Sequence, residues 1–145
     1  MKSYNLKPTA DLGLLLLRLM VGGAFIAHGA QKLFGAFGGP GMKGFMGFVG
    51  TFGLWPAVPS LWAWAAALAE FIGGIAILLG LLTGIAGIFI IIDMLVAIFS
   101  VHLKSGFFIQ NGGFEYALTI IIILLALILI GPGKYSVDRF IGWKF

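Results

Sequence analysis

The stretch that decides the fold runs from residue 61 to residue 101 and reads LWAWAAALAEFIGGIAILLGLLTGIAGIFIIIDMLVAIFSV. A helix needs about 20 apolar residues to cross the hydrocarbon core of a bilayer. The stretch holds two such runs, 61–82 and 85–101, and only Thr83 and Gly84 separate them. It therefore predicts two membrane-spanning helices joined as a tight antiparallel hairpin.

Two further apolar runs flank this hairpin. One spans residues 12–33 and begins after Pro8, whose fixed φ suits the first turn of a helix. The other spans residues 114–130 and is stopped by Gly131-Pro132-Gly133, where an amide donor is lost and backbone freedom is gained. The first run resembles a signal peptide in part, but Arg18 interrupts the uncharged core that such a peptide keeps. We therefore expect four spans.

The composition agrees with a membrane protein. Of the 145 residues 61% are hydrophobic and only 10% are charged, whereas an ordinary soluble domain has roughly 25% charged residues. We predict a single domain over residues 1–145, an all-α integral membrane protein built as a bundle of four transmembrane helices. The absence of cysteine excludes disulfides, iron–sulfur clusters and thiolate metal sites. The basic residues are scattered, which argues against nucleic acid as a partner.

Residues 34–59, between the first two spans, are too apolar for a solvated loop and too rich in glycine for a fifth span. Large apolar residues recur there at helical spacing: Met42, Phe45, Met46, Val49 and Phe52. This pattern predicts a short helix lying in the membrane interface. An irregular loop packed across the mouth of the bundle is the alternative.

Orientation follows from the basic residues near the span ends, because cytoplasmic loops carry an excess of Lys and Arg. One side carries five such residues: Lys2, Lys7, Lys134, Arg139 and Lys144. The other side carries three: Lys32, Lys43 and Lys104. Both termini are therefore predicted to be cytoplasmic.

A stripe of small residues marks the second span and the turn after it. Its members recur every three or four positions: Ala66, Ala69, Gly73, Ala76, Gly80, Gly84 and Gly87. Helices in lipid associate mainly through close backbone approach along such stripes. We interpret the stripe as the seam of the bundle, with a homodimer surface as the alternative.

Three ionisable residues fall at membrane depth, where each charge is costly. They are Arg18 in the first span, Glu70 in the second and Asp93 in the third. At the helical rise, Arg18 and Asp93 differ in depth by only about 3 Å. We therefore predict a buried ion pair between Arg18 and Asp93, with Glu70 sharing the guanidinium or turning toward His28. A purely structural role in fixing the rotation of the helices is the alternative.

A second polar group gathers near the outer ends of the spans. His28 and Lys32 end the first span, His102 ends the third, and Glu115 begins the fourth. Together with Glu70 they form a candidate site for a small molecule with a polar headgroup, under a lid of aromatic side chains. His102 can join this group only if its helix ends near residue 100. No metal site is predicted.

The sequence resembles the DoxX family of small four-helix membrane proteins. The resemblance rests on the run from Arg18 through His28 and Lys32 to Gly35, and on three later motifs. These motifs are Glu70 with Gly73-Gly74 and Leu79 to Thr83, Asn111-Gly-Gly-Phe-Glu115-Tyr, and Gly131 to Asp138. The resemblance implies a bacterial or archaeal inner-membrane protein. Such proteins are often described as subunits of quinol oxidases or thiosulfate:quinone oxidoreductases. The family's recurring polar positions map to Arg18, His28, Lys32, Glu70 and Glu115.

These observations favour a redox-associated membrane protein that binds a quinone, or a similar small aromatic headgroup, in the outer half of the bundle. Electron transfer would require a flavin, a haem or a partner subunit, because the sequence carries no motif for either cofactor. No catalytic residue is assigned. A transporter of small solutes or protons, with the intramembrane charges as its relay, is the alternative from another class. A structural assembly subunit of an oxidoreductase complex is the third possibility.

Overall fold

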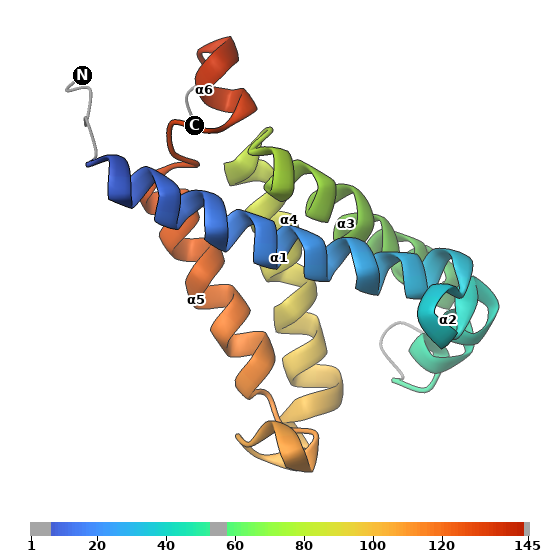
Figure 1. The fold of residues 1–145 in the computed structure, drawn as a ribbon. Coiled ribbons are helices and arrows are strands. Elements are labelled where there is room, and N and C mark those ends of the chain that lie inside the picture. The colour runs from blue at the N-terminus through green and yellow to red at the C-terminus, as the bar shows by residue number, and fades with distance from the viewer. Residues whose placement is uncertain (1–6, 53–57, 144–145) are drawn as a thin grey trace.

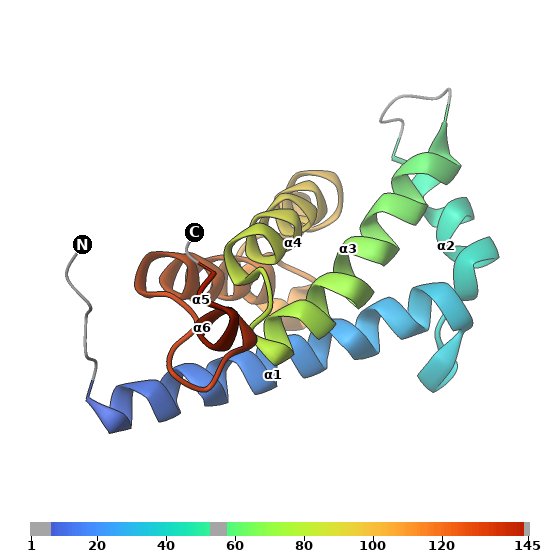
Figure 2. The same ribbon diagram turned by 90° about the horizontal axis from the view of Figure 1, so that it is seen from above.

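The computed structural model describes residues 7–52 and 58–143, and within these ranges all regular structure is helical. Figures 1 and 2 show two pairs of long helices. Helices α1 (Pro8–Phe34) and α3 (Pro59–Leu79) pair with each other, as do α4 (Thr83–Ala97) and α5 (Glu115–Ile130). The two pairs run in different directions from the end where the short helix α6 (Val137–Ile141) lies (Figure 1).

Three described helices are long and apolar enough to cross a membrane: Pro8–Phe34, Pro59–Leu79 and the helical segment Thr83–Ser105. Helix α5 is apolar but has only 16 residues. Both α1 and α3 begin with a proline in the first turn and end at a glycine in the left-handed conformation, Gly35 or Gly80. Proline in the first turn and a left-handed glycine at the end therefore mark the bounds of both helices.

Helices α1 and α3 approach each other closely through glycines. A Cβ atom on Gly22 would lie 2.6 Å from the Cβ of Leu78, and one on Gly29 would lie 2.6 Å from the amide nitrogen of Phe71. A Cβ on Gly74 would lie 2.7 Å from the backbone nitrogen of Ile26. Real Cβ atoms do not approach backbone so closely, so this contact requires glycine.

The hydrophobic core lies where the two pairs cross. Its fully buried members come from α1, α3, α4 and α5: Val21, Phe25, Ile77, Ile90, Leu124 and Leu127. The stripe of small residues contributes here, because Gly73 faces Ile90 of α4 and Gly87 faces Ile128 of α5.

The segment between the first two long helices contains the expected short helix, α2 (Gly41–Gly50), after a brief turn at Ala36–Gly38. Phe45 of α2 is buried against Ala63 and Ala67 of α3. Its position relative to a membrane interface stays a prediction. Trp55 and Pro56, which precede the second span in the sequence, and the charges Lys2 and Lys144 lie outside the described residues.

The hairpin turn begins three residues earlier than predicted and is one residue longer. Helix α3 ends at Leu79 and α4 begins at Thr83, so the turn is Gly80–Leu82 and not Thr83-Gly84. The turn is fixed at this position because Asp138, far along the chain, caps the start of α4. Asp138 accepts hydrogen bonds from the backbone N–H of Leu82 at 2.6 Å and of Thr83 at 2.9 Å, and from the Thr83 hydroxyl at 2.8 Å.

We expect the glycine contact between α1 and α3 to control stability. Gly22→Ala should lower the free energy of unfolding by about 1–3 kcal/mol, because the added methyl group meets backbone that cannot move aside. Gly23→Ala is the matched control, since a Cβ there meets nothing within 4 Å. Thermal unfolding of the two purified variants in one detergent checks this. Equal melting temperatures would contradict the close contact.

Candidate functional site

An ion pair links the last turn of α1 to the middle of α3. The ammonium nitrogen of Lys32, in the last turn of α1, lies 2.5 Å from Oε2 of Glu70 on α3. The Lys32 side chain is 22% exposed and that of Glu70 only 3%. The ring of Phe45 covers the ammonium group from α2, with its centroid 4.8 Å from Nζ. A cation is thus held between a carboxylate and an aromatic face.

Asp93 of α4 is the third charged member of this group. Its carboxyl lies close enough to Glu70 and Lys32 for electrostatic interactions with both. One ammonium and two ionised carboxylates have a formal charge of −1, which a bound proton can balance. The arrangement therefore suits a site that holds and releases a proton.

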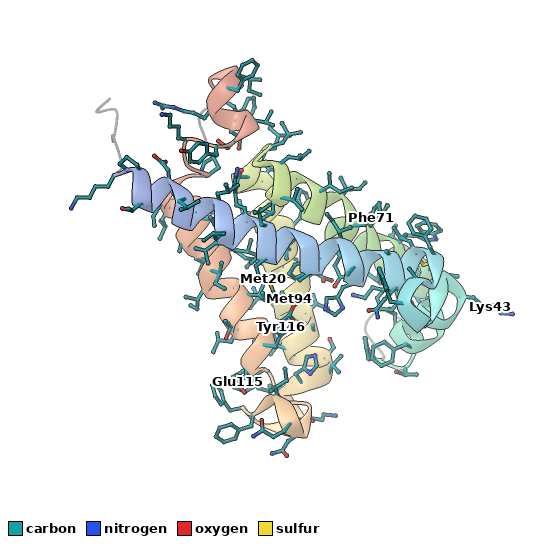
Figure 3. All side chains as sticks on the ribbon, in the orientation of Figure 1. Met20, Lys43, Phe71, Met94, Glu115 and Tyr116 are labelled. Atoms are coloured by element: carbon teal, nitrogen blue, oxygen red, sulfur yellow. The ribbon has the colours of Figure 1, made fainter. Side chains whose placement is uncertain are left out.

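Tyr116 and His28 extend the group toward α5. Tyr116, in the first turn of α5, is close enough to Glu70 for an electrostatic interaction. Its ring centroid lies 6.3 Å from that of His28. We call His28, Lys32, Glu70, Asp93 and Tyr116 the polar cluster. Figure 3 labels Tyr116 beside Glu115 in the first turn of α5, at the end of that helix away from α6.

Two predicted site residues lie outside the polar cluster and hold the loop before α5. Oε2 of Glu115 accepts a hydrogen bond from the backbone N–H of Ile109 at 3.0 Å. Nδ1 of His102 lies 2.7 Å from the carbonyl oxygen of Gly112. The regular α-helix does end before His102, at Ala97, and continues as a π-helical turn. Glu115 lies at the far end of α5 in Figure 3.

The predicted contact between Arg18 and Asp93 is wrong. Arg18 is only 1% exposed, and its Nη2 donates to the carbonyl oxygen of Tyr135. The carboxylate that acts on Arg18 among the described residues is Asp138. The guanidinium also packs against Gly80, where any side chain would collide with it. The depth of Arg18 along its helix predicted the wrong partner, because the segment after α5 folds back over the α3–α4 turn.

The segment after α5 also forms hydrogen bonds with the α3–α4 turn and with the first turn of α1. The backbone N–H of Asp138 donates to the carbonyl oxygen of Gly80 at 2.8 Å. The N–H of Lys134 donates to Oδ1 of Asp11, in the first turn of α1, at 2.8 Å. Asp138 is 4% exposed. Arg18 and Asp138 therefore belong to a closed structural joint, separate from the polar cluster.

Sequence reasoning overlooked Tyr116 and Asp138 as important residues. Both stand in motifs that carried the family resemblance, at the end of Asn111-Gly-Gly-Phe-Glu115-Tyr and of Gly131 to Asp138. No helical periodicity marked either one. In residues 7–52 and 58–143 there is no group of three His, Cys, Asp or Glu side chains that could hold a metal ion.

A family model described as DoxX matches residues 13–103 of the chain. The protein named "Putative oxidoreductase CatD" from Bacillus subtilis is 38% identical over 131 residues, which cover 90% of this chain and 88% of that protein. "Inner membrane protein YqjF" from Escherichia coli is 31% identical over 140 residues, covering 97% of this chain and all of that protein. A membrane protein of Mycobacterium tuberculosis is 33% identical over 138 residues, covering 86% and 78%. No solved structure matches the chain.

We expect Asp138, and not Asp93, to be energetically coupled to Arg18. Asp138→Asn should cost about 1–3 kcal/mol of unfolding free energy, because it removes one of the two carboxylate oxygens that accept from Leu82 and Thr83 and also the negative charge that acts on Arg18. Arg18→Gln should recover part of that loss, with a coupling energy of about 0.5–3 kcal/mol in a double-mutant cycle.

The matched cycle pairs Arg18→Gln with Asp93→Asn and should be additive within about 0.5 kcal/mol. Denaturation in mixed micelles measures both cycles. Strong coupling of Arg18 to Asp93 alone would restore the pairing expected from depth.

Proposed function

Because the chain belongs to the DoxX family of membrane proteins, we propose that it is a redox-associated membrane subunit that binds a quinone or a similar small aromatic headgroup at the polar cluster. The observation that carries this proposal is the Lys32–Glu70 ion pair, which is joined by Asp93 and Tyr116 from two further helices. Buried charges at membrane depth mark functional sites by default, because their insertion is costly.

The chemistry of the cluster suits a quinone headgroup. Such a headgroup has two carbonyl oxygens that need hydrogen-bond donors, and the Lys32 ammonium and the Tyr116 hydroxyl are donors. Glu70 and Asp93 can hold or accept the proton that accompanies a change in the headgroup's redox state. The exposed ring of His28 and the partly exposed Tyr116 lie at the accessible side of the cluster.

The redox role is supported by the word "oxidoreductase" in the name of the Bacillus relative. We propose that a partner subunit supplies the electrons, because the sequence carries no flavin or haem motif. In this proposal the chain binds and positions the headgroup and handles its proton, and a further protein completes the reaction.

The proposal includes a topology. Helix α5 is the fourth span, and α2 lies in the interface of a prokaryotic inner membrane. The contact between Lys134 and Asp11 places the start of α1 and the segment after α5 at one end of the molecule. Both termini then lie on the cytoplasmic side, as the basic residues predict.

A second candidate function, transport of a small solute or a proton, is favoured by the same buried carboxyl pair on α3 and α4. Solute or proton flux in reconstituted vesicles separates the two. Flux that Glu70→Gln abolishes would favour the carrier. Copurification with a catalytic subunit and no ligand binding would favour a structural assembly subunit.

We expect Glu70→Gln to weaken the binding of a naphthoquinone headgroup by about tenfold or more, because it removes the carboxylate that holds the Lys32 donor in place, and a charge-assisted contact is worth about 1.5–3 kcal/mol. Tyr116→Phe should weaken it about fivefold through the loss of one neutral hydrogen bond. Equilibrium titration of the purified protein in nanodiscs, followed by tryptophan fluorescence, measures these affinities.

Glu115→Gln is the matched control, because its amide oxygen can still accept from the Ile109 N–H and the residue lies outside the polar cluster. Its affinity should stay within about twofold of the parent. Unchanged binding in Glu70→Gln and Tyr116→Phe would rule out the polar cluster as the headgroup site.

A further inference from the structure

An apolar groove of about 400 Å³ lies between α3 and α4. This volume falls within the range of roughly 300–1,000 Å³ that is usual for small-molecule sites. Every residue that lines the groove is apolar. Chemically, the groove can therefore hold hydrocarbon and cannot orient a polar group by itself.

The groove has a floor of small residues and a rim of large ones. Ala69, Gly73 and Ala76 of α3 form the floor on one side, and Ala86 of α4, only 7% exposed, continues it. Ile72 and Phe89 stand at the rim and are each 58% exposed. Because both helices are candidate membrane spans, the groove opens onto the lipid-facing surface and an occupant enters it from the bilayer.

The groove leads to the polar cluster along one face of α4. Residues spaced by three, four and seven positions share a helix face, so Ala86, Phe89 and Asp93 lie in one row on α4, and Leu82 stands just before the helix begins. Leu82, Ala86 and Phe89 line the groove, and Asp93 follows Phe89 by one helical turn. The Asp93 side chain is partly exposed and interacts with Glu70. Hydrocarbon in the groove thus ends beside carboxyl groups at membrane depth.

We propose, building on the function proposed above, that the groove holds the polyprenyl tail of a membrane quinone whose headgroup lies at the polar cluster. A phospholipid chain fits the groove less well, because its polar end belongs at the membrane surface and not beside Asp93. An isoprenoid quinone has its polar ring at one end of a long hydrocarbon chain and can place that ring within the bilayer. The ligand class is therefore a tailed, lipid-soluble quinone and not a free aromatic compound.

The test compares 2-methyl-1,4-naphthoquinone with the same headgroup carrying a four-isoprene tail. Both are titrated into the full-length protein in nanodiscs and compared at equal mole fraction in the lipid, which removes the effect of partitioning. In lipid a tail gains affinity only by packing, so we expect the tailed quinone to bind about tenfold more tightly. Ala69→Leu with Ala76→Leu fills the groove floor and should abolish this preference while affinity for the tailless ring stays within about twofold.

Gly23→Leu is the matched control, because it adds the same side chain where a Cβ meets nothing within 4 Å, and it should keep the preference. Phe89→Ala removes one rim and should reduce the preference without filling the groove. Equal affinity of the two quinones for the parent protein, or a preference that survives in the double leucine variant, overturns the groove proposal and leaves the headgroup site standing. Loss of a dimer in the double leucine variant would identify the groove as a contact between two copies and overturn the proposal as well. Binding of neither quinone defeats the proposed function itself.

Discussion

The backbone contact between α1 and α3 is the constraint on which the site depends. Lipid offers helices little hydrophobic reason to associate, so close packing must provide the attraction. Gly22, Gly29 and Gly74 allow that packing, since any side chain there would meet backbone of the other helix. The same contact sets the register that brings Lys32 to Glu70. An ion pair with a carboxylate only 3% exposed is then held in a fixed place, as a binding site within a membrane requires.

The two ends of the molecule handle charge differently. At the end near α6, Asp138 accepts three hydrogen bonds from the start of α4 and also faces Arg18. This joint is buried: the carboxylate of Asp138 is fully used by the start of α4, whereas Arg18 donates from Nη2 and leaves Nε and Nη1 without a hydrogen-bond partner within residues 7–52 and 58–143. In the polar cluster, by contrast, the Lys32 side chain is 22% exposed and Tyr116 is 37% exposed. The closed joint serves stability, whereas the cluster retains groups that a ligand can reach.

The long helices and the family could be predicted from the sequence, because apolar runs, helix-start signals such as Pro8 and helix-end signals such as Gly131 are local. The resemblance to the DoxX family is confirmed by the matched family model.

Most residues of the polar cluster could be named from the sequence, but which of them lie together could not. Lys32 was assigned to the headgroup site and Asp93 to the ion pair with Arg18, while Glu70 was counted in both, since depth along a helix says nothing of its rotation. The partner of Arg18 and the position of the α3–α4 turn were missed for one reason. Both depend on Asp138, which reaches them only through tertiary folding.

The joint between Arg18 and the C-terminal segment also has a consequence for biosynthesis. Tyr135, whose carbonyl oxygen accepts from Arg18, follows it by 117 residues. At a translation rate of about 5–20 residues per second, the arginine is made many seconds before its partners. Until then the ribosome-bound chain presents an unneutralised guanidinium in its first apolar segment. Water, lipid headgroups or the insertion machinery must solvate that cation meanwhile, and its contact with the C-terminal segment forms only after the chain around Tyr135 has been made.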